Sequence, residues 1–331
     1  MQTGLSRLTF LAPVLSILIV GTVSGAALGQ SDSPDEIAER QMEVDLQAAT
    51  QWMLDQPDPV RQAAGLLMQQ KLESSSSRTS ENPEVLEARI AELLYQSKDP
   101  LNLALLAAVC NQTGIQNRCI KLGLADAIII HDQGNAISLA SLYAEDPEGL
   151  QNALLSMQKV NDYIFAIAEV WDRALEDYLK VGRDTERHML ASFQAMAIVQ
   201  AISIPGYSRL ASSCRQETGE STIAMACARI SELARHSSNS LILRMIGLTL
   251  ARERALAAGN EALAEEIDSE QKDLQNRVIC IHQQIPESHW RESNDTTSNW
   301  IRSAAELGEV GATEALGEHY DVDCPGISSK S

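Results

Sequence analysis

Aromatic residues are scarce in this chain of 331 residues: there are 3 Phe, 4 Trp and 6 Tyr, or 4% of the total. β-sandwiches and β-barrels rely on aromatic and β-branched side chains, so this composition argues against an all-β fold. Basic residues are also in deficit, because 26 Lys and Arg stand against 45 Asp and Glu and give a net charge of −19. Proteins that bind nucleic acids need a basic surface, so we expect no nucleic-acid partner.

The motifs of common enzyme classes are missing as well. The chain contains no HExxH, GxSxG, GxGxxG or Walker A motif and no CxxC pair. Ser156 and Lys159 fit the SxxK pattern of penicillin-binding enzymes, and residues 237–239 imitate their second motif. Their third motif, Lys-Thr-Gly on a strand, has no counterpart in this chain. The SxxK pattern fixes only two of four positions, so it is expected by chance in a chain of this length. The sequence therefore predicts no catalytic residues and no cofactor.

The first 29 residues have the pattern of a secretory signal peptide. Arg7 supplies a positive charge, residues 8–23 form the apolar region, and a small-x-small cleavage site at 27–29 precedes Gln30. The alternative is a membrane anchor, but a proline and a glycine interrupt the apolar stretch and an acidic segment follows it. No other stretch approaches the roughly 18 uninterrupted apolar residues of a membrane span. We expect an exported protein, periplasmic or secreted, with no stable membrane insertion after cleavage.

Six cysteines, all after the leader, form an even number in a chain expected to be exported, which indicates disulfides. Six cysteines can pair in many ways, but these fall into three neighbouring pairs. The expected bridges are therefore Cys110–Cys119, Cys214–Cys227 and Cys280–Cys324. The alternative is a zinc site, for which four ligands can be drawn: Cys280, His282, His289 and Cys324. The spacings of common zinc sites are absent and the export route is oxidising, so no metal ligands are expected.

Apolar residues recur at helical spacing along most of the chain, and Pro, Gly and Asn mark the ends of the segments. A polar tail at 30–34 precedes a helical domain at 35–331, which contains a Ser-rich linker at 74–80. Further helices are expected to start at Pro83 and Pro100. The other expected helices are 35–54, 59–73, 118–131, 135–144, 147–160, 161–181, 186–201, 221–236, 241–256 and 260–282.

These short helices are joined by short loops, and no run of alternating strand residues is present. The pattern predicts an all-α fold in which antiparallel helical hairpins are stacked as an irregular α-solenoid and linked by disulfides. Pro205-Gly206 is expected to close the helix that begins at 186.

Residues 299–320 read NWIRSAAELGEVGATEALGEHY and resemble a Sel1-like repeat, a member of the tetratricopeptide-type helical hairpins. Residues 135–160 show a looser form of the same pattern. The small residues let two helices cross closely, while Trp and Tyr fill the groove to a neighbouring repeat. The overall plan also resembles exported bacterial helical proteins of unknown function. The matching positions are Trp300, Ala304, Ala305, Glu306, Gly308, Ala312, Ala315, Leu316, Gly317 and Tyr320.

Helical repeats usually stack into curved binding surfaces, so fold analogy favours a non-enzymatic scaffold that binds a protein or peptide. One alternative is an exported hydrolase with an all-α fold and no recognisable motif, and another is a structural or stress-related envelope protein. A pocket that gathers His, Ser, Asp or Glu would favour the hydrolase. A groove lined by apolar and Asn side chains would favour the scaffold.

Overall fold

The computed structural model describes residues 34–75, 82–179, 186–216, 219, 221–237, 240–285 and 294–324. Within these ranges the chain is helical and has no β-strand, only one isolated bridge between Asn135 and Lys159. The expected leader lies outside the described residues, as does most of the expected Ser-rich linker. Contacts separate residues 1–41 from 42–331, and the description below concerns the second unit. No described helix is long and apolar enough to span a membrane.

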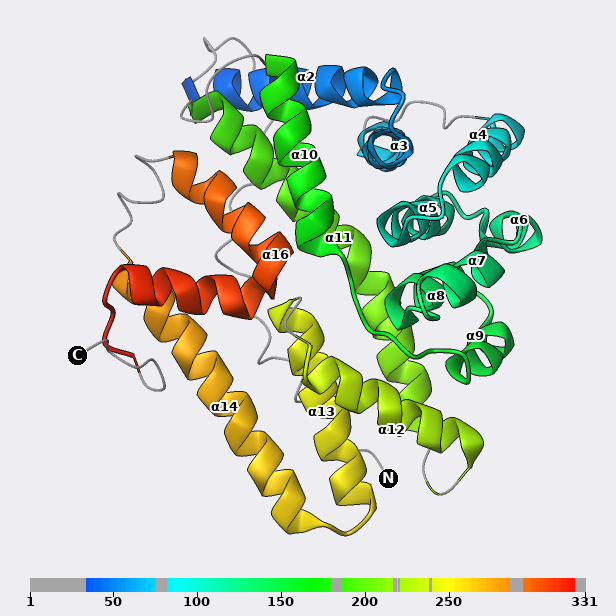
Figure 1. The fold of residues 1–331 in the computed structure, drawn as a ribbon, viewed down its shortest axis with the longest axis vertical. Helices are drawn as coiled ribbons and strands as arrows, with labels where there is room; N and C mark the ends of the chain where they lie inside the picture. Colours follow the sequence, from blue (N-terminus) through cyan, green and yellow to red (C-terminus); the bar gives the residue numbers. More distant parts are fainter. Residues whose placement is uncertain are drawn as a thin grey trace, which may run out of the picture. The chain divides into compact units, whose positions relative to one another are not determined.

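Short connections join most of the helices, which Figure 1 shows in chain order. Three of the helices begin at a capping residue that is followed by proline: Asn82, Asp99 and Asp146. The side chain of each capping residue accepts a hydrogen bond from a backbone amide in the first turn of its helix. The helices are α2 (Pro34–Leu54), α3 (Pro59–Ser75), α4 (Pro83–Gln96), α5 (Pro100–Gln112), α6 (Gln116–Lys121), α7 (Leu124–His131), α8 (Ala136–Leu142), α9 (Pro147–Leu154), α10 (Ile164–Leu179), α11 (Glu186–Gln216), α12 (Thr222–Arg235), α13 (Leu241–Ala257), α14 (Glu261–Gln284) and α16 (Asn294–His319).

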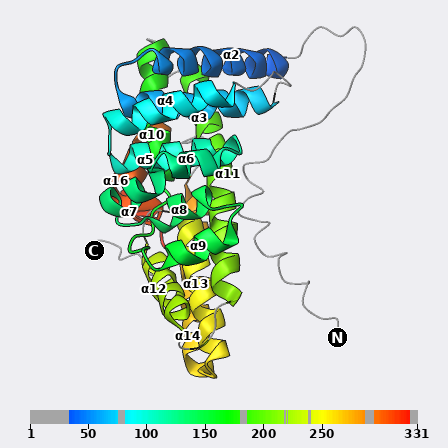
Figure 2. The same ribbon diagram turned by 90° about the vertical axis from the view of Figure 1, so that its right-hand side faces the viewer.

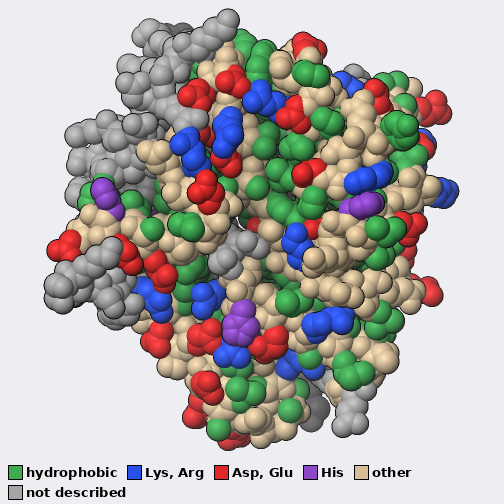
Figure 3. Space-filling model, viewed as in Figure 1, with side chains coloured by type: hydrophobic (Ala, Val, Ile, Leu, Met, Phe, Trp, Pro, Cys, Tyr) green, Lys and Arg blue, Asp and Glu red, His purple; other side chains and the backbone are tan. Residues whose placement is uncertain are grey.

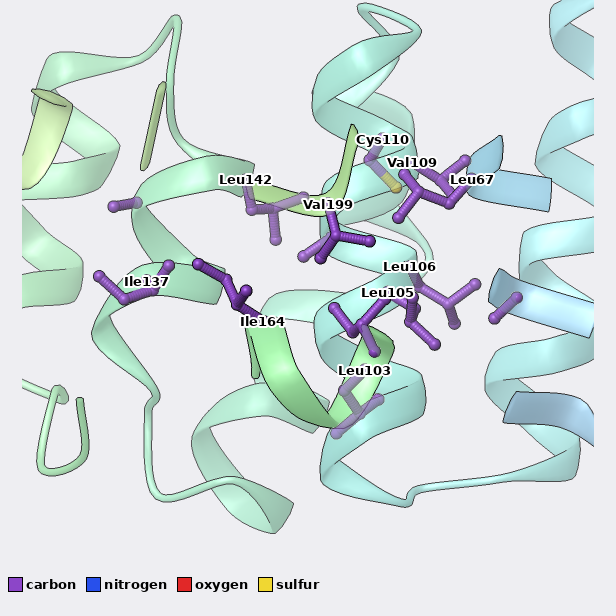
Figure 4. Packing of buried hydrophobic residues seen from close by; sticks show 14 of the residues in the cluster. Leu67, Leu103, Leu105, Leu106, Val109, Cys110, Ile137, Leu142, Ile164 and Val199 are labelled. Atoms are coloured by element: carbon purple, nitrogen blue, oxygen red, sulfur yellow. The ribbon is translucent and has the colours of Figure 1, made fainter. Parts of the chain in front are cut away.

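The helices from α3 to α9 are stacked on one another, and α11 crosses the stack (Figure 2). Their shared core is visible in Figure 4, where Leu67 of α3, Leu106 of α5 and Val199 of α11 meet. Each of these side chains is at most 1% exposed. The stack is joined to the second half of the molecule by α11, which touches α5, α8 and α9, and also by α10 on α3 and α5 and by α12 on α9.

The second half of the molecule packs around α10, α11 and α13. Helix α10 lies against α11 and α16, and its Trp171 is fully buried. Helices α12, α13 and α14 pack in sequence order. Gly247 allows α13 to cross α12 closely, because a Cβ atom there would lie 2.1 Å from the backbone nitrogen of Arg235.

The expected end of a helix at residue 201 is wrong, because α11 continues through Pro205-Gly206 to Gln216. Proline removes one helical hydrogen bond, but tertiary packing overrides this preference. Gly206 lies directly against α8, where a Cβ atom would come within 2.7 Å of the Ser141 hydroxyl oxygen. The close contact between the two helices explains why the helix extends past the proline.

The expected helices over 147–160 and 161–181 are also too long at their junction. Helix α9 ends at Leu154 and α10 begins at Ile164. The residues between the two helices lie alongside the α7–α8 loop and form backbone hydrogen bonds with it. The Gln158 amide donates to the Gln133 carbonyl at 3.0 Å, and the Ala136 amide donates to the Lys159 carbonyl at 2.9 Å. These long-range bonds replace helical ones, so local periodicity could not reveal the break.

The expected helix over 118–131 is likewise two helices, α6 and α7. They are separated at Gly123, whose φ of 84° lies in the left-handed region that favours glycine.

The six cysteines lie in three pairs at disulfide distance, the pairs that their spacing favoured. The S–S distances are 2.04 Å for Cys110–Cys119, 2.09 Å for Cys214–Cys227 and 2.05 Å for Cys280–Cys324. The first joins α5 to α6, the second joins α11 to α12, and the third ties the segment after α16 to α14. Each bridge therefore links helices that are neighbours in the fold.

Replacing Gly247 by alanine tests the crossing of α12 and α13. The new methyl group meets backbone atoms, which cannot rotate away, so we expect Gly247→Ala to lower the free energy of unfolding by about 1–3 kcal/mol. Urea unfolding followed by circular dichroism measures this loss. The matched control is Gly311→Ala, whose Cβ would meet only the Leu307 Cβ at 3.2 Å. Equal stability of the two variants would contradict the close crossing.

Candidate functional site

The C-terminal helix α16 is bent into two arms (Figure 1). Side chains of both arms line a groove. The bend is at Gly308, where φ is 77° and ψ is 162°. The groove has a volume of about 330 Å³, which is within the range of small-ligand and side-chain pockets. Its lining residues come from both arms and are Asn299, Trp300, Ser303, Ala312, Ala315, Leu316, His319 and Tyr320.

The lining of the groove combines apolar and aromatic side chains with a similar share of polar groups. Trp300, Leu316 and Tyr320 are half-buried, so each combines packing against the protein with an accessible face. The His319 ring stands edge-on to Tyr320, with centroids 4.9 Å apart. Asn299 and Ser303 add hydrogen-bonding groups on the opposite arm. Such a surface suits an apolar side chain carried by a polar backbone.

Contacts with α10 and the core hold the first arm of the groove. The Trp300 ring stacks edge-on against Phe165, with centroids 5.2 Å apart. Asp172, which is 2% exposed, accepts hydrogen bonds from the hydroxyls of Ser298 at 2.9 Å and Ser192 at 2.8 Å. The arm also buries Ile301 in the main core. Trp300 is therefore positioned before any ligand arrives.

The second arm is held by α14. Arg277 makes an ion pair with Glu314, with 2.6 Å between Nη1 and Oε1. Just beyond the arm, Gln284 exchanges two hydrogen bonds with the backbone of Asp323, at 2.9 and 3.2 Å. The third disulfide lies beside this exchange. Leu316 and Tyr320 pack on the small apolar cluster formed by Ile281, Ile285, Val322 and Cys324.

The bend between the arms is anchored to the N-terminus of α13. Glu309 follows Gly308 directly, and its Oε2 atom accepts a hydrogen bond from the Leu241 amide at 2.6 Å. Glu309 is half-buried as a residue, and desolvation of its carboxyl group raises its pKa to about 7. The nearby Asp162 adds to this rise, while the Leu241 amide opposes it.

Asp162 forms a second, fully enclosed polar site deeper in the molecule. It accepts hydrogen bonds from the hydroxyls of Tyr207, at 2.5 Å, and Ser240, and burial raises its pKa. A cavity of about 20 Å³ adjoins it, lined also by Ser138 and Ser141. This volume holds about one water molecule, so a substrate has no room beside the carboxylate.

Lys159 of the SxxK pattern is engaged with Asp132 and Tyr163 and not with Ser156 as a catalytic base would be. The Lys159 amine lies 2.7 Å from Asp132 and 2.5 Å from the Tyr163 hydroxyl, which itself donates to Asp132 at 2.7 Å. Burial, followed by the effect of Asp132, raises the pKa of Tyr163. These three groups hold the segment after α9 on the α7–α8 loop, so Lys159 has a positional role here.

The residues drawn as a zinc site do not come together as ligands. Cys280 and Cys324 are at disulfide distance from each other, and His289 lies outside the described residues. Within the described ranges, no three His, Cys, Asp or Glu side chains are grouped so that they could hold a metal ion.

The Sel1-like positions converge on the groove. Trp300, Ala312, Ala315, Leu316 and Tyr320 line it. Of the remaining positions, Ala304, Gly308 and Gly317 are buried, Ala305 is half-buried against the main core, and Glu306 is exposed. The sequence predicted these residues as packing positions of a repeat hairpin, and it gave no indication of a groove or of the places of Glu309 and His319.

No protein-family profile, curated protein or solved structure matches this chain. The site is therefore interpreted from its own geometry and chemistry.

Removing the third disulfide tests how the second arm is held. We expect the double variant Cys280→Ser, Cys324→Ser to lose hydrogen-exchange protection at residues 309–324, because the arm loses its covalent tie to α14. By the chain-entropy estimate the bridge contributes about 4 kcal/mol. The control removes Cys110–Cys119 and should loosen α5 and α6 instead. A uniform loss of protection in both variants would contradict this assignment.

Proposed function

We propose that the protein is an exported, non-enzymatic scaffold of irregular α-solenoid type that binds a segment of another protein in the groove of α16. One observation carries the proposal: an open groove with aromatic walls whose two arms are held by separate parts of the fold. Pre-organised sites bind more tightly because less conformational entropy is lost on binding. The Sel1-like pattern of the lining residues supports the same function, since hairpins of that type present binding surfaces.

The groove fits a short segment with an apolar side chain next to Lys or Arg. Trp300, Leu316 and Tyr320 provide the apolar and aromatic contacts. Asp321 and Asp323, both exposed, follow directly after Tyr320 and favour a cationic neighbour. The net charge of −19 attracts a basic partner at longer range. Acidic side chains are mixed with Lys and Arg on the face shown in Figure 3. The acids beside Tyr320, rather than this face as a whole, therefore favour a basic partner.

The hydrolase alternative has less support from the geometry. The buried polar cluster around Asp162 contains Ser and Asp side chains, as a hydrolytic site would. Its adjoining cavity of about 20 Å³ has room for about one water molecule, however. The larger groove includes Ser303 and His319 on opposite arms, but neither Asp nor Glu is among its lining residues. Its apolar and Asn side chains are the surface expected of a scaffold.

Selection of peptides from a displayed random library against the purified mature protein tests the proposed function. We expect the selected peptides to share an apolar residue beside Lys or Arg. Ala315→Trp should weaken their binding at least ~10-fold, because the exposed Ala315 lines the groove and the indole would fill it.

The matched control is Ala257→Trp, at an exposed position at the end of α13. It should leave the affinity unchanged. Peptides that bind Ala315→Trp as well as wild type, or a selection that yields no peptide with a Kd below about 100 μM, would contradict the proposal.

A further inference from the structure

The three disulfides differ in the exposure of their cysteines. Cys280 is half-buried on α14, whereas each of the other five cysteines is at most 3% exposed. An external thiolate must reach the sulfur that it attacks, so access decides which disulfide reacts first in the folded protein. Cys280 is therefore the preferred point of attack.

A hydrogen-bond donor lies beside both sulfurs of this bridge. The side-chain nitrogen of Gln284 is 3.2 Å from the Cys280 Sγ atom and 3.3 Å from the Cys324 Sγ atom. It carries two hydrogens, of which one is directed to the Asp323 carbonyl at 2.9 Å and the other is left for the sulfurs. Hydrogen bonds to ionised acceptors are the stronger ones, so this donor stabilises a departing thiolate more than the intact disulfide. Gln284 thus favours the opening of the bridge.

The same bridge lies under one wall of the groove. Cys324 belongs to the small apolar cluster on which Leu316 and Tyr320 pack, and Cys280 packs against that cluster as well. Leu316 and Tyr320 are also lining residues of the groove. Opening the bridge removes the covalent tie beneath these two side chains.

We propose that Cys280 is a site of reversible thiol–disulfide exchange with a dithiol, and that this exchange releases the second arm of α16 from α14. The first thiolate of the dithiol bonds to the Cys280 Sγ atom, the bond to Cys324 breaks, and Cys324 leaves as a thiolate that takes a proton from water. The second thiolate then attacks the dithiol sulfur that is bonded to Cys280. The dithiol ends as a disulfide, and both cysteines end as thiols.

Partial reduction of the folded protein with dithiothreitol tests the site. Rapid alkylation of the freed thiols and peptide mapping give the rate at which each bridge opens. We expect Cys280–Cys324 to open at least ~10-fold faster than either of the other two bridges, because only this bridge has an accessible cysteine. Equal rates for the three bridges, or an earlier opening of another one, would overturn the proposal.

The monothiol 2-mercaptoethanol identifies the sulfur that is attacked, because its mixed disulfide is preserved by acid quenching. We expect the adduct on Cys280 and a free thiol on Cys324. An adduct mainly on Cys324 would overturn the assignment to Cys280.

The variant Gln284→Glu tests the donor. It keeps the acceptor for the Asp323 amide, which lies 3.2 Å from the Gln284 side-chain oxygen, and it removes the donor to the sulfurs. We expect its bridge to open at least ~3-fold more slowly than in wild type. A side chain that only held the segment would have the opposite effect, so faster opening would overturn the role of Gln284. The matched control is Gln283→Glu, which adds the same charge at the exposed neighbouring position and should react as wild type.

Hydrogen exchange before and after the selective reduction tests the release of the arm. We expect residues 309–324 to lose protection at least ~10-fold and to regain it on reoxidation, while α3 and α5 stay constant. Selective reduction with unchanged protection would overturn the release.

The effect of the exchange on ligand binding rests on the proposed function, whereas the exchange itself is a property of the unliganded protein. The two fail separately. Selective reduction with no peptide ligand would leave the exchange site standing and remove the proposed function. Peptide binding with unselective reduction would leave the function standing and remove the exchange site.

Discussion

The backbone conformation of Gly308 is the constraint on which the groove depends. A φ of 77° combined with a ψ of 162° is accessible in practice only to glycine. At this one residue a helix that would otherwise continue changes direction, and the two arms then face each other. Trp300 and Tyr320 can line the same groove only because the chain turns between them.

Three separate parts of the fold keep the bend in place. Asp172 and Phe165 hold the first arm, α14 and its disulfide hold the second, and the N-terminus of α13 holds the bend itself. These supports come from positions far apart in the sequence. The groove is therefore a product of the whole second half of the molecule, and its shape responds to changes in any of the three supports.

Much of the helical order could be predicted because its signals are local. A capping Asn or Asp followed by proline marked the starts at Pro83, Pro100 and Pro147. The signals failed where distant residues decide the backbone. Pro205 lies inside α11 because Gly206 packs against α8, and residues 155–163 are irregular because they bond to the α7–α8 loop.

The candidate site was predictable only as a helical segment, because the sequence indicated a repeat hairpin and no groove. Small residues and the aromatic pair Trp300 and Tyr320 pointed to a helical hairpin at 299–320, and several of those residues line the groove. Glu309 gave no signal, because a glutamate on a helix is usually a solvated residue. Its role at the bend depends on the Leu241 amide, which the sequence places 68 positions away. Only the folded chain brings them together.

The free energy of unfolding of Gly308→Ala, compared with that of Gly311→Ala, tests the central claim most directly. A Cβ atom at position 308 forces the backbone out of its conformation, so we predict a loss of about 1–3 kcal/mol. Gly311 lies in helical backbone beside an exposed leucine, so its replacement should be neutral or slightly stabilising. Equal stability of the two variants would show that the bend does not depend on Gly308 and would contradict this account of the groove.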